Sequence, residues 1–262
     1  MTSSEFEQGN QCSEQGDFNQ AIVFYKQALA GSFDDEYLHV NLGHAYLKSA
    51  RFREGIEHLE LHFPSRNSVA MPYEVLVNLG LLYHGSGDSD QALALLREAS
   101  NNVSIRPEAY IGIAEVYSQQ GTLDDVVEIF TNAQIECGRD AKLHNYIGSF
   151  YNDVVGDHRL ATIHFFIAHK ASPENAAILG NLGIAQVATG AYADAIESLS
   201  KAIKINAEYI PAYWNLAVAL YNNGEYGRAV TLLDQVIRKF PAYAAENNLK
   251  AMRDDALEAA KS

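Results

Sequence analysis

The sequence predicts an all-α protein, a solenoid of seven helix-turn-helix units followed by one terminal helix. Three observations lead to this prediction. One pattern recurs about every 34 residues, small residues recur at fixed positions within it, and apolar residues follow the helical spacing of about 3.6 residues per turn. A single copy could not cover its own apolar faces, so neighbouring copies must stack.

The copies are called repeats one to seven, in order along the chain. They comprise residues 2–35, 36–69, 73–106, 107–140, 141–175, 176–209 and 210–243. Three extra residues, Ala70-Met71-Pro72, follow repeat two, and repeat five has one extra residue near Val154-Val155. Both interruptions fall where turns are expected. Residues 244–262 are expected to form a capping helix with a polar outer face.

The first helix of each repeat carries a small residue at its eighth position. These residues are Gly9, Gly43, Gly80, Ala114, Gly148, Gly183 and Ala217. Glycine inside a helix costs roughly 1 kcal/mol relative to alanine, so this position predicts a close approach by another helix. The approaching helix is the second helix of the same repeat, where a large residue such as Leu199 stands between Ala195 and Ala202.

The fifteenth position of each repeat predicts the turn between its two helices. It holds Gly16, Ala50, Gly87, Gly121, Gly156, Gly190 and Gly224. A left-handed residue here ends the first helix and lets the chain reverse, and an aspartate such as Asp88 then starts the second helix.

The spacing from Asn215-Leu216-Ala217 through Gly224-Glu225-Tyr226 to Ala229 resembles the tetratricopeptide repeat, and the resemblance covers residues 2–243. It implies a right-handed superhelix whose concave side binds proteins. Repeat two departs most from the family pattern, with Gly55 and His62 where alanine is usual and Pro64 shortly after.

Composition and motifs exclude several classes of function. Acidic residues outnumber basic ones 33 to 19, giving a formal net charge of -14 that opposes binding to nucleic acid and anionic membranes. The sequence contains no HExxH, GxSxG or phosphate-loop motif, so we expect neither an enzyme nor a cofactor. The first residues lack a basic, apolar leader and Cys12 lies far from Cys137, so we expect a cytoplasmic protein.

Histidines raise the question of a metal site. His58 and His62 lie one helical turn apart, whereas His164 and His169 are badly spaced for one helix face. A divalent ion needs three or four convergent ligands. Ordinary packing or solvation is therefore the favoured interpretation of these histidines, and no metal is expected.

The concave side offers candidate binding residues at the second, fifth, ninth and twelfth positions of each first helix. In repeats six and seven these positions include Ile184, Trp214, Val218 and Tyr221, and in repeats two and three the ninth position holds His44 and Leu81. The apolar run with the single tryptophan predicts an anchor for a partner, while packing against a neighbouring helix is the alternative.

The sixth position of several first helices holds asparagine, namely Asn41, Asn78, Asn181 and Asn215. An amide can both donate to and accept from an extended peptide, and the resemblance to the family implies this role. The same side chains could equally bridge adjacent helices without a ligand.

These features together predict a non-enzymatic protein-interaction scaffold that binds a peptide segment or a helix in its concave groove. The acidic charge favours a basic or amphipathic partner. Where co-chaperones of the family need basic groups to grip a carboxylate, this chain has Glu74, Glu108 and Gly112. The alternative is a structural protein that assembles with its own copies through the groove or the first repeat.

Overall fold

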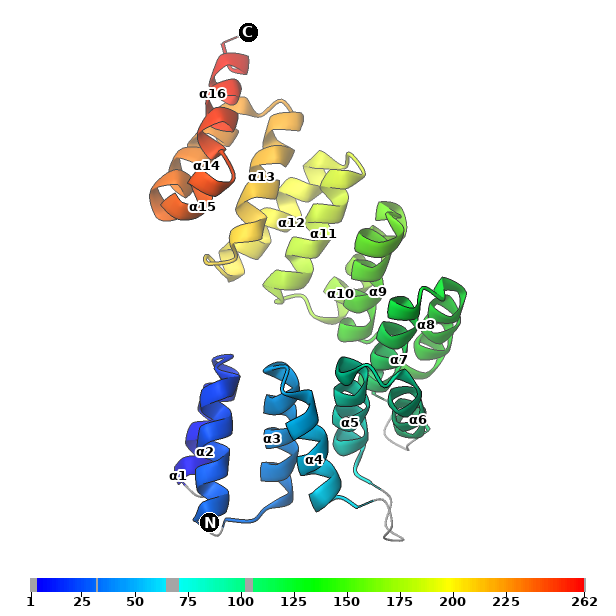
Figure 1. Ribbon diagram of the computed structural model, residues 1–262. Helices are drawn as coiled ribbons and strands as arrows, with labels where there is room; N and C mark the ends of the chain where they lie inside the picture. The colour runs from blue at the N-terminus through cyan, green and yellow to red at the C-terminus, as the bar shows by residue number, and fades with distance from the viewer. Residues whose placement is uncertain (1–3, 32, 65–70, 102–105, 262) are drawn as a thin grey trace. The chain divides into compact units, whose positions relative to one another are not determined.

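The computed structural model describes residues 4–31, 33–64, 71–101 and 106–261. The regular elements among these residues are all helices, which confirms the all-α prediction. The chain comprises two compact units, residues 1–138 and 139–262, which are described in turn. Each unit is a stack of helical hairpins (Figure 1).

Unit 1 contains four hairpins in its described part. Its helices are α1 (Ser4–Glu14), α2 (Phe18–Ala30), α3 (Glu36–Lys48), α4 (Phe52–His62), α5 (Tyr73–Ser86), α6 (Ser89–Ser100), α7 (Pro107–Gln120) and α8 (Leu123–Cys137). Each hairpin's two helices pack together, and the first helices α3, α5 and α7 also pack in succession. The first helices therefore form one layer, and its exposed side is called the first-helix face.

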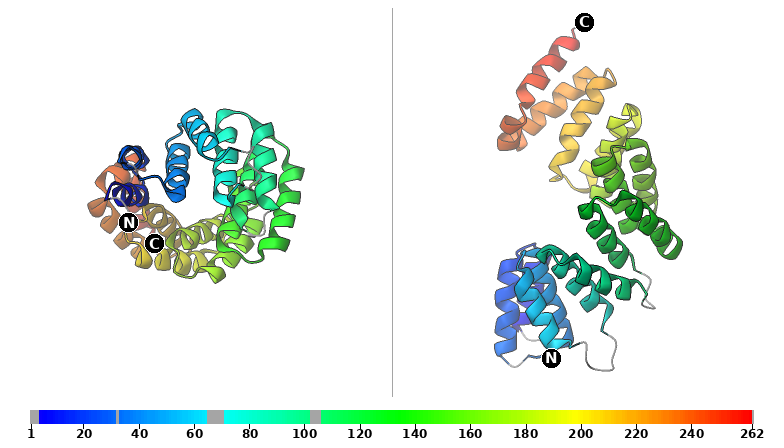
Figure 2. Two further views of the ribbon diagram at one scale, coloured as in Figure 1. Left: turned by 90° about the horizontal axis from the view of Figure 1, so that it is seen from below. Right: turned by 45° about the vertical axis from the view of Figure 1, so that its right-hand side comes forward.

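Unit 2 repeats this arrangement. Its helices are α9 (Ala141–Phe150), the π-helix η1 (Tyr151–Val155), α10 (His158–Ala171), α11 (Ala176–Ala188), α12 (Tyr192–Ile205), α13 (Ile210–Asn222), α14 (Tyr226–Lys239), α15 (Pro241–Glu246) and α16 (Leu249–Ala259). The first helices α11 and α13 contact each other, and α16 packs on α14, as the orange and red segments of Figure 2 show.

The small eighth position holds the two helices of a hairpin together. A Cβ added to Gly43 would lie 2.7 Å from Leu59 Cδ1, and one added to Gly183 would lie 2.4 Å from Leu199 Cγ. Both leucines are fully buried. Real carbon atoms do not approach so closely, so glycine is what allows these leucines to pack against the backbone of the first helix.

The predicted left-handed turns are confirmed. The φ angle lies between 77° and 92° at Gly16, Gly87, Gly121, Gly156, Gly190 and Gly224. In repeat two the same position is Ala50, with a φ of 56°. This conformation costs an alanine about 1–2 kcal/mol, because its Cβ approaches the following carbonyl oxygen.

The expectation that both interruptions lie in turns is wrong for repeat five. Val154 and Val155 belong to the π-helix η1, and the turn begins after them at Gly156. A π-turn takes up one residue more than an α-turn, so the helix itself absorbs the insertion. In the other interruption Ala70 lies outside the described residues, Met71 packs against buried residues of α5, and Pro72 precedes α5.

The C-terminal segment differs from the single capping helix predicted for residues 244–262. It forms two helices, α15 and α16, separated at Asn248, whose φ is 52°. Helix α16 buries Leu249 beside Leu233 of α14. The apolar side of the last hairpin is thereby covered, which is the role of a cap.

Candidate partner-binding faces

The first-helix face of unit 2 carries a row of apolar side chains on α13. Trp214, Val218 and Tyr221 follow one another at intervals of four and three residues, which places them on one side of the helix. All three are partly exposed, and so is Ile184 on the adjacent helix α11. The structure therefore brings these predicted anchors together on two neighbouring helices.

Two of these anchors, Trp214 and Tyr221, also pack against other side chains of unit 2. Trp214 packs against a buried cluster that contains Tyr213 and Leu233. The ring of Tyr221 meets that of Tyr226 edge-on, with 5.3 Å between ring centroids. Aromatic side chains fixed in this way lose little conformational entropy when a partner covers their exposed edges.

Part of the predicted apolar face is already covered. A Cβ added to Gly180 would lie 2.2 Å from Cε1 of Tyr209, the residue that precedes α13. Gly180 is buried as a result. Gly180 is the fifth position of repeat six, one of the positions predicted to face the concave side, but Tyr209 from the turn before α13 lies over it.

The predicted asparagines make internal hydrogen bonds. Asn41 Nδ2 donates to Asn10 Oδ1 on α1 at 3.0 Å, and Asn78 Nδ2 donates to the carbonyl oxygen of Val40 on α3 at 3.3 Å. Asn10 Oδ1 also accepts a hydrogen bond from the hydroxyl of Tyr25 at 2.9 Å. In unit 1 each of these amides thus links one first helix to the preceding one.

In unit 2 the two predicted asparagines differ from each other. Asn181 Nδ2 donates to Asn145 Oδ1 on α9 at 3.1 Å, which again bridges successive first helices. Asn215 Nδ2 donates to the carbonyl oxygen of Pro211 in its own helix at 2.9 Å. Each bond uses one of the two N–H donors that an amide has.

The two remaining predicted residues lie on the first-helix face of unit 1. His44 on α3 is partly exposed and meets the ring of Phe18 edge-on, with centroids 6.2 Å apart. Leu81 on α5 is also partly exposed and packs against the buried cluster around Leu76. Of these two residues only Leu81 is apolar, whereas the corresponding predicted residues Val218 on α13 and Ile184 on α11 are both apolar.

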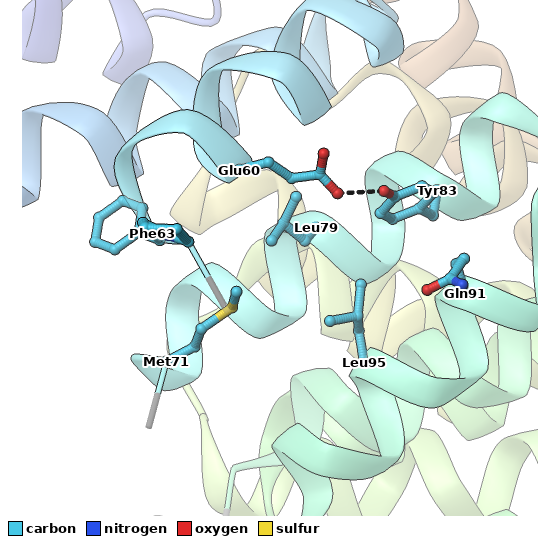
Figure 3. Close-up of a pocket in the computed structure, with 8 residues that line it drawn as sticks. Glu60, Phe63, Met71, Leu79, Tyr83, Gln91 and Leu95 are labelled. Carbon is cyan, nitrogen blue, oxygen red and sulfur yellow. Dashed lines mark hydrogen bonds between the residues drawn. The ribbon is translucent and has the colours of Figure 1, made fainter. Parts of the chain in front are cut away.

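A pocket of about 320 Å³ lies among α4, α5 and α6 (Figure 3). Leu79, Leu95 and Met71 line its apolar part, and the Tyr83 hydroxyl donates a hydrogen bond to Glu60 at its polar end. Burial, together with the Glu60 carboxylate, raises the pKa of Tyr83 to about 12. The hydroxyl of Tyr83 is thus already engaged in a hydrogen bond within the protein.

Comparison with models of protein families identifies the family of the repeats. Models described as tetratricopeptide repeat match residues 74–98, 161–210 and 186–252, and one described as TPR repeat matches residues 9–49. The chain belongs to the tetratricopeptide repeat family. Tetratricopeptide repeats are non-enzymatic protein-interaction scaffolds, in agreement with the prediction that this chain is not an enzyme. A search of curated proteins gives no significant match.

Solved structures share the fold of this tetratricopeptide repeat protein. A chain from the APC/C hetero-tetramer Cut9-Hcn1 aligns with a TM-score of 0.62 and 17% identity over 95% of this chain, which spans 48% of that one. The C-terminal part of a TPR repeat-containing protein from Cytophaga hutchinsonii has a TM-score of 0.58 and 16% identity, covering 90% and 96% of the two chains.

MamA from Desulfovibrio magneticus RS-1 is a third similar structure, with a TM-score of 0.53 and 18% identity. The alignment covers 64% of this chain and 96% of the MamA chain. At these identities the likeness concerns the fold. Among the helices in the described ranges, none is both long and apolar enough to cross a bilayer.

The second tetratricopeptide repeat also contains a histidine cluster that sequence reasoning missed. His39 on α3 is buried, and its Nδ1 lies 3.1 Å from Nε2 of His58 on α4. The rings of His39 and His62 stack with centroids 3.7 Å apart. On its other side, His39 Nε2 lies 2.6 Å from Oδ1 of the exposed Asp34.

The electrostatics of this cluster keep two of its rings neutral. Burial, with His62, His39 and Lys26 nearby, lowers the pKa of His58 to about 4. Burial and His39 also lower the pKa of His62. The hydrogen bond from His39 in turn lowers the pKa of the Asp34 carboxyl. A neutral imidazole has one unprotonated nitrogen available as an acceptor or a ligand.

A related pair of histidines occurs in the fifth tetratricopeptide repeat. His144 Nδ1 lies 2.9 Å from His164 Nδ1, and the ring of Tyr151 stacks on His164 with centroids 5.8 Å apart. Burial and His144 lower the pKa of His164 to about 4. In both repeats, the histidine at the fourth position of the first helix thus contacts a histidine of the second helix. This coincidence of positions is the sequence signal that could have found His39.

Proposed function

We propose that this chain is a protein-interaction scaffold that binds a peptide segment or a helix on the first-helix face of unit 2. Trp214, Val218 and Tyr221 on α13, with Ile184 on α11, are the anchors. The observation that carries the proposal is that these four apolar side chains are all partly exposed and belong to two first helices that pack against each other. Clustered aromatic anchors of this kind contribute most of the affinity in many interfaces.

Membership of the tetratricopeptide repeat family supports the proposal, because repeats of this family hold protein partners. The Cut9 and Hcn1 proteins, one of which has this fold, form a hetero-tetramer. A partner with basic residues beside its apolar ones would suit the net charge of -14. Asn181 and Asn215 would orient the partner's backbone with the amide atoms that their internal bonds leave over. We further propose that binding takes place in the cytoplasm.

In unit 1, Asn41, His44, Asn78 and Leu81 form the corresponding part of the proposal. They lie on α3 and α5, and Leu81 is the one apolar residue among these four. Asn78 is buried and bonded to the preceding helix. The proposal therefore assigns the stronger anchoring to unit 2.

The test compares partner capture by the wild-type chain, Trp214→Ala and Tyr221→Ala. Each substitution should weaken binding of a captured partner by about thirtyfold, since interface anchors contribute about 2 kcal/mol or more. Phe166→Ala is a matched control, because this aromatic residue on α10 is 48% exposed and lies outside the proposed site. Equal capture by all four chains would refute the assignment of the site.

Trp214 also provides a direct signal, since it is the only tryptophan in the chain. Partner binding at the proposed site should shift its fluorescence emission to shorter wavelength as water leaves the indole. Light scattering over a range of concentrations tests the alternative of self-assembly. A stable monomer favours the scaffold, whereas an oligomer that disappears with Tyr221→Ala would assign the same face to a second copy.

A further inference from the structure

Three imidazoles converge between α3 and α4, and the proposed binding of a partner makes no use of them. We propose that His39, His58 and His62 bind one divalent transition-metal ion of the Zn²⁺ class, with Asp34 as the group that positions His39. One ring nitrogen from each of the three histidines lies within 4.8 Å of the other two.

The distances approach those of a metal site. Zinc binds imidazole nitrogen at about 2.0–2.1 Å, so two nitrogens of a tetrahedral site lie about 3.3 Å apart. His39 Nδ1 and His58 Nε2 are 3.1 Å apart. Two of the three ligands are therefore already at the separation that one ion requires.

The third ligand requires a side-chain rotation. His62 stacks on His39 with an angle of 23° between the ring planes. An ion lies close to the plane of each ring that binds it, so His62 must turn out of this stack. It is exposed, and it stands one helical turn after His58 on the same side of α4.

Asp34 selects the nitrogen that His39 presents. The Nε2–H of His39 donates to Asp34 Oδ1 at 2.6 Å, which leaves the lone pair on Nδ1, facing His58. A carboxylate that accepts the outer N–H of a metal-binding histidine is the usual supporting partner in such sites. Without an ion, His58 Nε2–H donates to this lone pair, and a bound ion would replace that proton.

The donor set selects the class of ion. Three imidazole nitrogens suit Zn²⁺ and the neighbouring transition metals, whereas Ca²⁺ and Mg²⁺ require mainly oxygen ligands. His62 and Asp34 are exposed, so an ion can reach the cluster from solvent and keep water in its remaining position.

Repeat five provides an internal comparison. Its pair His144 and His164 occupies the same repeat positions as His39 and His58. Ala168 stands where repeat two has His62, and Arg139 stands where repeat two has Asp34. The fifth repeat thus has the histidine pair without the third ligand or the supporting carboxylate, and the proposal predicts no ion there.

The test is calorimetric titration of Zn²⁺ into the full chain prepared without a histidine tag. The wild-type protein should bind one equivalent. His62→Ala should weaken binding by about a hundredfold or more, and because His62 is exposed this variant should fold normally. Asp34→Asn should weaken binding by about ten- to a hundredfold, the range found for supporting groups. His164→Ala is the matched control and should bind as the wild type does.

Co²⁺ provides a second measurement that does not depend on affinity alone. A site with three imidazoles and water should give visible absorption bands of four- or five-coordinate cobalt, and Asp34→Asn should retain their shape at saturation. Wild-type binding that is no tighter than that of His62→Ala would overturn the proposal. Loss of binding in His164→Ala with full binding in His62→Ala would overturn it as well.

Discussion

Replacing Gly183 by alanine tests whether the close contact between the two helices of a hairpin specifies the fold. The added Cβ would lie 2.4 Å from Cγ and 2.8 Å from Cδ2 of Leu199, which is fully buried and cannot move aside cheaply. Overpacking of this kind costs about 1–3 kcal/mol, and the better helix propensity of alanine returns about 1 kcal/mol. Gly183→Ala should therefore lower the free energy of unfolding by up to about 2 kcal/mol.

The sign of this effect should reverse when Leu199 is shortened. Leu199→Ala removes the three atoms nearest to the added Cβ and by itself should cost about 2–5 kcal/mol. In that background, Gly183→Ala should stabilise by about 1 kcal/mol, because only the gain in helix propensity remains. The two changes should thus show a coupling energy of about 1–3 kcal/mol.

Urea denaturation followed by circular dichroism measures this cycle. The data should be fitted with a nearest-neighbour model, since stacked repeats can unfold in parts. Gly190→Ala is the control: its φ is 78° with no atom within 4 Å of an added Cβ, so it should cost about 1–2 kcal/mol in both backgrounds. An equal effect of Gly183→Ala with and without Leu199 would refute the packing argument.

Two further predictions concern polar groups in unit 2. The pKa of His164, which faces His144 and Tyr151, is lowered to about 4, so the unfolded chain binds more protons between about pH 6.5 and 4. The free energy of unfolding should therefore fall as pH decreases through this window, and His164→Asn should flatten the decline in urea titrations at several pH values; an unchanged slope would contradict the assignment. Asn181→Ala should cost about 1 kcal/mol of stability through loss of its bond to Asn145, measured by thermal unfolding. Asn215→Ala, which breaks only a bond within its own helix, should cost less, and the opposite ranking would argue against bridging as the role of Asn181.

Much of the fold follows from local sequence patterns. The spacing of the apolar residues predicts helices, because a turn of 3.6 residues places these residues on one side of each helix. Gly190 and Gly224 predict the turns because a left-handed residue is easiest for glycine. The contact between Leu199 and Gly183 is also predictable, because a large side chain on the second helix needs a position without a side chain on the first helix. These inferences need only a residue and its immediate repeat.

The contacts that decide the sites depend on how side chains of different helices meet. Spacing along the chain places Gly180 on the open face, but Tyr209 lies over it. Spacing pairs His58 with His62, but only the packing of α3 on α4 adds His39.

The sequence by itself thus determined the family, the helices and the set of residues available on each face. The tertiary structure decided which amides bridge helices, how a one-residue insertion became a π-helix and which histidines converge. The physical reason is that helix formation and reversal depend on neighbours within one repeat. Contacts between side chains of different helices depend on how the helices are oriented and on which side-chain rotamers the packing selects.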